Sequence, residues 1–377
     1  MKNLLIIGGG HAHVEVLRQL GLKKPAGVVV TLISPDRYTP YSGMLPGLVA
    51  GHYSFEQCHI DLQSLAQFAG ARLVLAHAVA LDASQRGVTL SDGSTLDYDV
   101  ASIDTGSVPV AQQVAGVAQH AIAVKPVGTF LAAWEALQAR VQTGQVRAIA
   151  VVGGGAAGVE VLLAIQHRLA QLHLRAKPEY GLVTDTPQLM SQHAPGVRTV
   201  LERSLARKGV AVHRGLRVTR VEADALTALD ADGREQRIAA DAVFWITGAA
   251  PPAWLKGSGL ALNDNKFINI NKHLQSTSAA SVFAAGDCAT LEGAVYPKSG
   301  VYAVRQGPVL AENLQRALTG ASLLEYTPQR RALALISTGE RHAIASWGIL
   351  SFHGNWVWRW KDHIDQAFMA KYQDLMR

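Results

Sequence analysis

Two glycine-rich turns are the segments of this chain whose residue types and spacing are suited to binding a ligand. Gly8-Gly9-Gly10 follows the apolar run Leu4–Ile7, and Gly153–Gly158 follows the apolar run Ala148–Val152. Glycine lets the backbone approach a phosphate without a Cβ clash, and the N-terminus of a following helix adds free N–H groups and the positive end of a dipole. Because both segments read as strand, turn and helix, we predict two dinucleotide sites in one chain.

The second turn is the more complete of the two. It holds all three glycines of the dinucleotide fingerprint, Gly153, Gly155 and Gly158, and the last of them lets the helix pack closely on the strand. The first turn has His13 at the third position, which we expect to loosen that packing. His11 and His13 suggest a metal site, but no third ligand lies near them in the sequence. Phosphate contact or packing is therefore the preferred interpretation, and no metal is predicted.

Polar residues after the neighbouring strands are candidates for binding the ribose of each dinucleotide. The β-branched run Val28–Ile33 predicts the next parallel strand of the first unit, and Ser34 and Asp36 follow it. In the second unit, Asp185 follows the predicted strand Tyr180–Thr184. An acid at this point repels a 2′-phosphate and favours NADH over NADPH. Asp185 falls one position late for that role, so the preference stays open.

The order of these elements predicts an α/β protein with two Rossmann-like nucleotide-binding domains and a small α+β C-terminal domain. The first domain is expected to be discontinuous, comprising residues 1–115 and 249–324, with an antiparallel insertion that turns at Ser91–Ser94. The second domain is expected at residues 116–248 and the C-terminal domain at residues 325–377.

Further ligand contacts are expected where strands end. Two apolar runs end in glycine, at Gly248 and at Gly286-Asp287, and in open α/β sheets ligands bind at the carboxyl edge. Tyr38–Gly51 is rich in Pro, Gly and Tyr, and we expect it to be neither regular helix nor strand. One interpretation is a ligand loop that contains Pro40, and the other is a plain surface loop.

Composition narrows the classes of function. The chain has 377 residues, of which 49% are hydrophobic and 17% charged, enough to fill globular cores. The net charge of +6 comes from scattered Lys and Arg, so no nucleic-acid partner is predicted. Cys58 and Cys288 have no metal or disulfide spacing, and no run reaches the ~18 apolar residues of a membrane span. We therefore expect a cytoplasmic protein.

The tail of the chain is aromatic, and its role is open. Trp360, Ile364, Phe368, Tyr372 and Leu375 are predicted to fall on one face of a helix. Such a face suits peripheral association with the inner face of the membrane. It equally suits packing on the protein's own core or a homodimer interface.

Taken together, these motifs resemble the two-dinucleotide flavoproteins of the pyridine nucleotide-disulphide oxidoreductase superfamily. The resemblance implies FAD at Gly8-x-Gly10 and NAD(P)H at the second turn. Asp104-Thr105-Gly106-Ser107 and Trp245–Gly248 resemble the family's two linker turns, which implies that Thr105, Gly106 and Gly248 contact cofactors. Val282–Asp287 resembles the second flavin motif, in which Gly286 and Asp287 hold the ribitol chain.

The resemblance also implies three catalytic residues. Glu160 is expected on the nicotinamide side, although its place in the first turn of a helix would also explain an acid. Lys298 would add positive charge near the reduced flavin, at the start of a helix near Gly300. Gln306 lies in Val304–Gly307, which is similar to the helix beside the flavin in type II NADH:quinone dehydrogenases.

The absence of cysteines from one segment argues against the disulfide-reductase branch of the superfamily. The segment Tyr38–Gly47 contains none where disulfide reductases carry a redox pair, so a disulfide relay is not expected. Tyr41–Gly47 and Trp358–Asp365 resemble the dehydrogenase-like module found fused to, or encoded beside, selenide, water dikinase, which implies a functional link to that enzyme. The predicted function is hydride transfer from NAD(P)H to FAD, then electron transfer to a quinone or another small acceptor. Alternatives are a reductase in selenium or sulfur metabolism and a flavin-binding redox sensor with little turnover.

Overall fold

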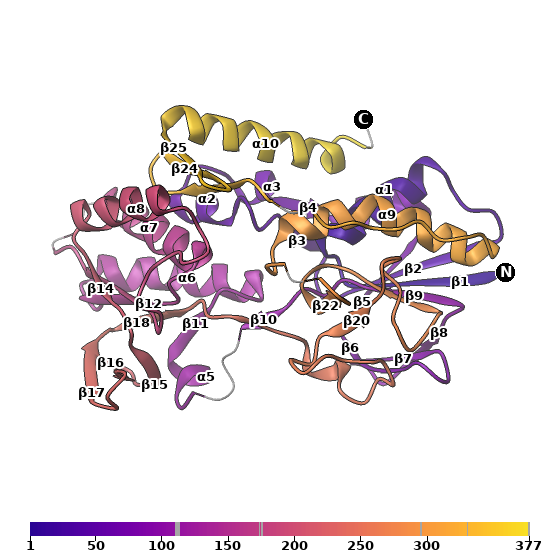
Figure 1. Ribbon diagram of the computed structural model, residues 1–377, viewed down its shortest axis with the longest axis horizontal. Coiled ribbons are helices and arrows are strands. Elements are labelled where there is room, and N and C mark those ends of the chain that lie inside the picture. The colour runs from indigo at the N-terminus through magenta and orange to yellow at the C-terminus, as the bar shows by residue number, and fades with distance from the viewer. Residues whose placement is uncertain (110–113, 173, 175, 295, 330, 376–377) are drawn as a thin grey trace.

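Two five-stranded parallel sheets dominate the computed structural model, in which residues 1–109, 114–172, 174, 176–294, 296–329 and 331–375 are described (Figure 1). In spatial order, the first sheet consists of β21 (Val282–Ala284), β9 (Val100–Ile103), β1 (Lys2–Ile7), β2 (Val28–Ser34) and β5 (Arg72–Leu75). The second consists of β11 (Ala121–Ala123), β18 (Ala242–Trp245), β12 (Ala148–Val152), β13 (Glu179–Val183) and β14 (Val210–His213). The predicted pair of Rossmann-like units is confirmed.

Each sheet is enclosed by helices because its central strands are apolar on both faces. The first core is covered by α1 (His11–Leu22), α4 (Leu62–Ala69) and α9 (Gly300–Thr319), and α1 packs along α9. The second core is covered by α6 (Val127–Gln142), α7 (Ala156–Ala170) and α8 (Pro195–Arg207). The two turns singled out in the sequence connect β1 to α1 and β12 to α7.

Antiparallel strands extend both units. The first unit carries the expected insertion, β6 (Ala78–Asp82), β7 (Gly87–Leu90) and β8 (Thr95–Asp97). The second unit carries an insertion that the sequence did not predict, β15 (Arg217–Val221), β16 (Ala225–Leu229) and β17 (Glu235–Ala239). A parallel pair, β20 (Ile268–Ile270) with β22 (Ala289–Leu291), lies near β21. The chain passes between the units at β10 (Val108–Pro109) and β19 (Ala249–Ala250), which pair antiparallel.

The expectation of an irregular segment over Tyr38–Gly51 was wrong. Its first residues form β3 (Tyr38–Pro40), which pairs with β4 (His59–Asp61), and it continues into α2 (Leu45–Ala50). Proline is tolerated here because Pro40 lies in a two-stranded ribbon and Pro46 lies in the first helical turn, where no intrahelical N–H bond is lost. Gly51 ends α2 in the left-handed conformation. Short helices α3 (Phe55–Cys58) and α5 (Val117–His120) complete the two units.

The C-terminal unit combines a small sheet with a long helix. The sheet contains β23 (Ala334–Ser337), β24 (Ala343–Trp347) and β25 (Leu350–Gly354), and α10 (Asn355–Gln373) follows. Figure 1 shows this helix, in yellow, lying across the top of the molecule from the second unit toward the first. Over the described ranges, no helix is long and apolar enough to cross a bilayer.

The predicted apolar stripe on α10 does not form a single face. Trp360 and Ile364 are exposed, whereas Phe368 and Tyr372 are buried against the first core. Residues four apart advance about 40° around a helix of 3.6 residues per turn, so a stripe at this spacing rotates from solvent toward the interior. One end of the stripe therefore faces solvent, and the other packs on the first core.

Candidate active site

The first glycine turn is shaped by its contact with Asp104. A Cβ on Gly8 or Gly10 would overlap Asp104, and Gly8 has a φ of +96°. Asp104 Oδ2 accepts a hydrogen bond from the Ala12 N–H at 2.8 Å, inside the first turn of α1. Gly10 caps this helix without a side-chain hydrogen bond. The turn thus requires glycine, and an anionic ligand at the N-terminus of α1 is left with the N–H groups that Asp104 does not bind.

Asp104 is a buried acid that the sequence motif contained but did not identify as a site residue. Burial raises its pKa to about 7, and the nearby negative charge of Asp287 acts in the same direction. The Ala12 N–H bond and Lys125 act in the opposite direction. Close to neutral pH, the carboxyl group therefore exchanges a proton beside the first turn.

The two histidines of the turn have different surroundings. His13 is fully buried, and its ring nitrogens lie 2.7 Å from Gly8 O and 2.7 Å from Ser102 Oγ. Burial lowers the pKa of both His11 and His13 to about 4, so both are neutral at pH 7. His13 thus matches the packing interpretation, because its hydrogen bonds tie the turn to β9. His11 is only partly buried, and its Nε2 lies 3.4 Å from the Ser42 backbone N.

An orphaned hydroxyl supports binding of a ligand at the linker turn. Thr105 Oγ1 is buried and has no hydrogen-bond partner within the described part of the chain. Gly106 follows with a φ of +68°, and a Cβ there would meet open space. A buried polar atom without a partner is costly, so a cofactor hydroxyl or phosphate would satisfy it. An unpartnered hydroxyl beside a glycine is compatible with FAD at this turn, and the contacts of Thr105 and Gly106 with it stay a prediction.

The candidate ribose residues lie at the end of β2. Ser34 is buried and its hydroxyl donates to Asp36 O at 2.8 Å, while the side chain of Asp36 is exposed. Thr39, beside Pro40 on β3, donates to Gly9 O at 2.7 Å. The structure therefore brings this segment against the first turn, and the Asp36 carboxylate has no ion-pair partner among the described residues.

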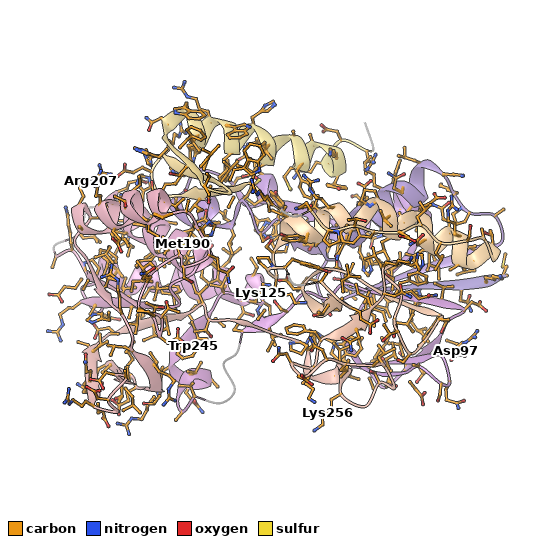
Figure 2. The ribbon with its side chains drawn as sticks, in the orientation of Figure 1. Asp97, Lys125, Met190, Arg207, Trp245 and Lys256 are labelled. Carbon is orange, nitrogen blue, oxygen red and sulfur yellow. The ribbon has the colours of Figure 1, made fainter. Side chains whose placement is uncertain are left out.

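Asp287 is held by two residues that the sequence analysis did not select. Its Oδ2 accepts a hydrogen bond from Ser107 Oγ at 3.2 Å and lies 3.3 Å from Lys125 Nζ. Lys125 follows β11 of the second sheet, and Figure 2 shows it between the two units. Ser107 belongs to the linker motif, but no sequence motif marks Lys125.

Gln306 and Lys298 have unequal relations to this site. Gln306 is buried, and its Oε1 accepts a hydrogen bond from Gly286 N at 2.8 Å, which fixes the Gly286-Asp287 turn. Lys298 instead donates to Ala289 O and, at 2.9 Å, to Thr290 Oγ1. The ammonium of Lys298 is thus directed at β22, and its role as a charge near the flavin stays a prediction.

The second turn has the geometry that its three glycines predict. A Cβ on Gly153 would overlap Ile246 O, and one on Gly158 would overlap Gly153 O. Gly155 caps α7 without a side-chain hydrogen bond, and a Cβ there would meet open space. Gly248 follows β18 and Asp185 follows β13, and both are exposed. The arrangement leaves a helix N-terminus free for a second pyrophosphate.

Glu160 faces the C-terminal unit. It is the fifth residue of α7, so its predicted place in the first turn was wrong, and the helix dipole does not explain it. Its Oε1 accepts a hydrogen bond from Ser337 N at 2.7 Å. Its pKa is raised to about 7, chiefly by burial and to a smaller extent by Asp365, while Lys361 and the hydrogen bond from Ser337 N act in the opposite direction. Glu160 is therefore an acid that can hold or release a proton near neutral pH.

A buried ion pair on α10 adjoins Glu160. Lys361 Nζ donates to Asp365 Oδ2 and to Gly43 O, both at 2.6 Å. The Tyr41 ring stacks on Phe368 with centroids 4.3 Å apart. Burial raises the pKa of Asp365. The C-terminal unit thus closes over the Tyr41–Gly43 segment, a contact that sequence spacing did not reveal.

Burial disfavours the thiolate form of both cysteines. Cys58 and Cys288 are free and buried, and burial raises the pKa of each to about 12. The Cys288 Sγ donates to Ala285 O at 3.2 Å, and Cys58 Sγ lies 4.0 Å from Met44 O. Nowhere in the described ranges do three or more His, Cys, Asp or Glu side chains gather as a metal site would require.

Comparisons with known proteins agree with this geometry. The chain matches the pyridine nucleotide-disulphide oxidoreductase family over residues 2–307. It is 23% identical to the NADH dehydrogenase-like protein YutJ of Bacillus subtilis, with 87% of each chain covered. It is 24% identical to the demethylphylloquinone reductase NdbB of Synechocystis, covering 89% of this chain and 85% of the relative. Its fold is similar to that of NDH2 from Plasmodium falciparum in complex with NADH, with a TM-score of 0.81, 14% identity, and coverage of 99% and 98%.

Proposed function

Because the chain belongs to the pyridine nucleotide-disulphide oxidoreductase family, we propose that it passes electrons from NAD(P)H through FAD to a quinone or another small acceptor. It is an FAD-dependent NAD(P)H oxidoreductase, like its NADH dehydrogenase-like relatives. We propose an external acceptor because both thiols are buried against carbonyl groups. Cysteine reacts as its thiolate, and thiols with a pKa of about 12 supply almost none at neutral pH.

The protein's own residues have distinct tasks in this proposal. The N-termini of α1 and α7 bind the two pyrophosphates, and Asp287, with Lys125 and Ser107, positions the ribitol chain. When bound, FAD supplies the chemistry that takes a hydride from the nicotinamide and passes electrons on. The fold contributes orientation, because two bound cofactors react without a bimolecular encounter.

A quinone is supported by the surroundings of Glu160. Reduction of a quinone to a quinol consumes two protons, and an acid with a pKa of about 7 is suited to supply one near neutral pH. The aromatic pair of Tyr41 and Phe368, the second of which belongs to α10, lies on the same side, where a flat ring could stack. The name of the Synechocystis relative also describes reduction of a quinone.

The test is anaerobic reduction followed by a choice of acceptors. The purified protein should show a flavin spectrum that bleaches on addition of NADH or NADPH and recovers on addition of a soluble quinone. A flavin that stays oxidised with both nucleotides would overturn the proposal. Reoxidation by selenium or sulfur species but not by quinone would favour the selenium or sulfur reductase linked to selenide, water dikinase. Reduction without multiple turnover by any acceptor would favour the redox sensor.

We further propose that the outer face of the C-terminal unit binds a membrane surface, where quinones are dissolved. Large apolar side chains gather on the β24–β25 turn and on the adjoining half of α10. The exposed ones are Trp347, Ile349, Leu350, Phe352, Trp356, Trp360 and Ile364. Arg359 and His363 are exposed on the same helix, and the net charge is +6. Aromatic rings beside basic groups suit the interface of an anionic bilayer.

Co-sedimentation with vesicles tests this surface. The wild type should bind vesicles that contain phosphatidylglycerol more strongly than vesicles of phosphatidylcholine alone. The double variant Trp356→Ser/Trp360→Ser should lose most of this binding while keeping NADH-dependent flavin reduction. Exchange of exposed Leu22 for Ser, far from this surface, serves as the control. Equal binding of all three proteins would contradict the proposal, and a loss of dimer in the double variant would assign the surface to a homodimer.

A further inference from the structure

We propose that a cavity between α1, α9 and the end of α10 binds a small organic anion. The cavity has a volume of about 450 Å³. Its walls come from four segments that lie far apart in the sequence. They contribute Arg18 from α1, Arg305 from α9, Tyr326 from the connection after α9, and Lys371 from α10. None of the residues assigned above to FAD or NAD(P)H lines it. The cavity is therefore a site separate from both nucleotide turns.

The carboxylates that line the cavity are already neutralised. Glu15 accepts two hydrogen bonds from Arg18, each 2.9 Å long, and a third from Tyr372 Oη at 3.0 Å. Glu325 pairs with Lys272 at 2.5 Å. Because each acid has its own cation, neither would repel an anionic ligand with a full unpaired charge.

Two further cations of the cavity lack such partners. Arg305 and Lys371 line the same space, and neither forms an ion pair with another residue whose position is described. With Arg18 committed to Glu15, these two side chains give the cavity an excess of positive charge. A guanidinium and an ammonium group favour a phosphate or carboxylate head group.

Two unsatisfied polar atoms in the walls point to the same class of ligand. Tyr326 is 6% exposed and its Oη has no hydrogen-bond partner, and the buried Nε2 of Gln329 has none either, among the described residues. Both atoms can donate, and burial without an acceptor is unfavourable. Because both atoms are almost inaccessible in the free protein, their side chains would have to turn toward the cavity for oxygen atoms of a bound anion to accept from them.

The size and walls of the cavity argue against a bare inorganic ion as the natural ligand. Val304, Pro308 and Val309 form an apolar wall along α9. A cavity of about 450 Å³ is much larger than the roughly 30 Å³ of liquid volume that one water occupies. The ligand class that fits is an anionic head on a compact apolar or aromatic body.

Calorimetric titration of the FAD-loaded protein with phenyl phosphate tests the proposal, with NAD⁺ present at saturation to fill the second turn. Phenyl phosphate should bind, with inorganic phosphate weaker and neutral benzyl alcohol not detectable. Arg305→Gln and Lys371→Gln should each weaken the binding of phenyl phosphate by roughly tenfold. Tyr326→Phe should weaken it several-fold without lowering the thermal midpoint of the free protein, because its hydroxyl has no partner to lose.

Two matched controls make the result specific to the cavity. Tyr98 is also buried with an unpartnered hydroxyl, and Lys256 is an exposed lysine outside the cavity, marked in Figure 2. Tyr98→Phe and Lys256→Gln should bind phenyl phosphate like the wild type. Absence of binding to the wild type, or equal affinity in the three cavity variants and the two controls, would overturn the proposal.

Discussion

The ammonium of Lys125 lies 3.3 Å from Oδ2 of Asp287, and this ion pair joins a residue after β11 of the second sheet to a residue after β21 of the first. The lysine therefore places a charge from one nucleotide-binding unit on Asp287 of the other, the acid proposed to position the ribitol chain. Removal of this charge would leave the Asp287 carboxylate to repel the pyrophosphate of FAD.

Lys125→Met should release FAD more readily than the wild type, and Lys125→Arg should retain most of the affinity. The pair is partly exposed, so an effect of about 1 kcal/mol, or roughly fivefold in the FAD dissociation constant, is expected. Recovery of FAD fluorescence on dilution measures it. Lys256→Met is the control for loss of a lysine, and equal FAD retention in the Lys125 and Lys256 variants would contradict the role of the pair.

Asp104 should make stability depend on pH. Its pKa is about 7 in the folded protein and near 4 in an unfolded chain, so the folded protein binds the proton more tightly. The free energy of unfolding therefore falls as the pH rises from about 4 to about 7. Asp104→Asn keeps an oxygen that accepts from Ala12 N but does not titrate. We therefore expect the variant to gain stability relative to the wild type as the pH rises from 5 to 8. The gain should be about 1–3 kcal/mol, and it is measured as a growing difference between the two thermal midpoints.

The control for this experiment is Asp264→Asn, which changes an exposed acid. Its thermal midpoint should follow that of the wild type at every pH. Parallel curves for the wild type and Asp104→Asn between pH 5 and pH 8 would show that the buried carboxyl does not titrate in this range.

Glu160 should set the pH profile of turnover with a quinone. If its protonated form supplies a proton, kcat falls as the pH rises through about 7, where the carboxyl loses that proton. Glu160→Gln should lower kcat at least roughly tenfold at pH 6, with a smaller loss at pH 9, and should flatten the profile. Steady-state assays from pH 5.5 to pH 9 measure this. Glu135→Gln, on the exposed side of α6, should behave like the wild type. If kcat of Glu160→Gln falls with rising pH as it does in the wild type, Glu160 is not the proton donor.

The Lys361–Asp365 pair should show strong coupling. Lys361→Met leaves Asp365 buried without its cation and should destabilise the protein by about 3–5 kcal/mol. Lys361→Met/Asp365→Leu should recover most of that loss, because both charges are then removed. Thermal unfolding followed by circular dichroism compares them, with exposed Arg359→Met as the control on the same helix. A double variant that is even less stable than Lys361→Met would contradict the coupling between the two charges.

Asp185 should influence the choice of nicotinamide cofactor. Its exposed carboxylate follows β13, where it would repel the 2′-phosphate of NADPH. Asp185→Asn should raise kcat/KM for NADPH relative to NADH by roughly tenfold, the equivalent of about 1.4 kcal/mol. Glu179→Gln makes the same change of charge at the other end of the strand and should leave the ratio unaltered. A ratio that is also unaltered in Asp185→Asn would remove this residue from the ribose site.

Short-range features of the fold were predictable because they depend on neighbouring residues. Apolar runs such as Leu4–Ile7 form buried parallel strands, and the glycines that follow are needed for steric reasons within the same turn. The segment from Tyr38 to Gly51 was mispredicted because prolines at a strand edge and in a first helical turn cost little, and composition alone does not reveal those positions.

The amino-acid sequence by itself determined two strand–turn–helix units, the need for glycine in each turn, and the absence of a cysteine pair beside the first. Only the tertiary structure decided that Lys125 meets Asp287, that Glu160 bonds Ser337, and that α10 divides its aromatic side chains between core and solvent. The reason is physical: steric limits on φ and on close backbone contact act within a few residues. The partners of a charged side chain are chosen by packing of elements that lie far apart in the chain, and no local pattern encodes them.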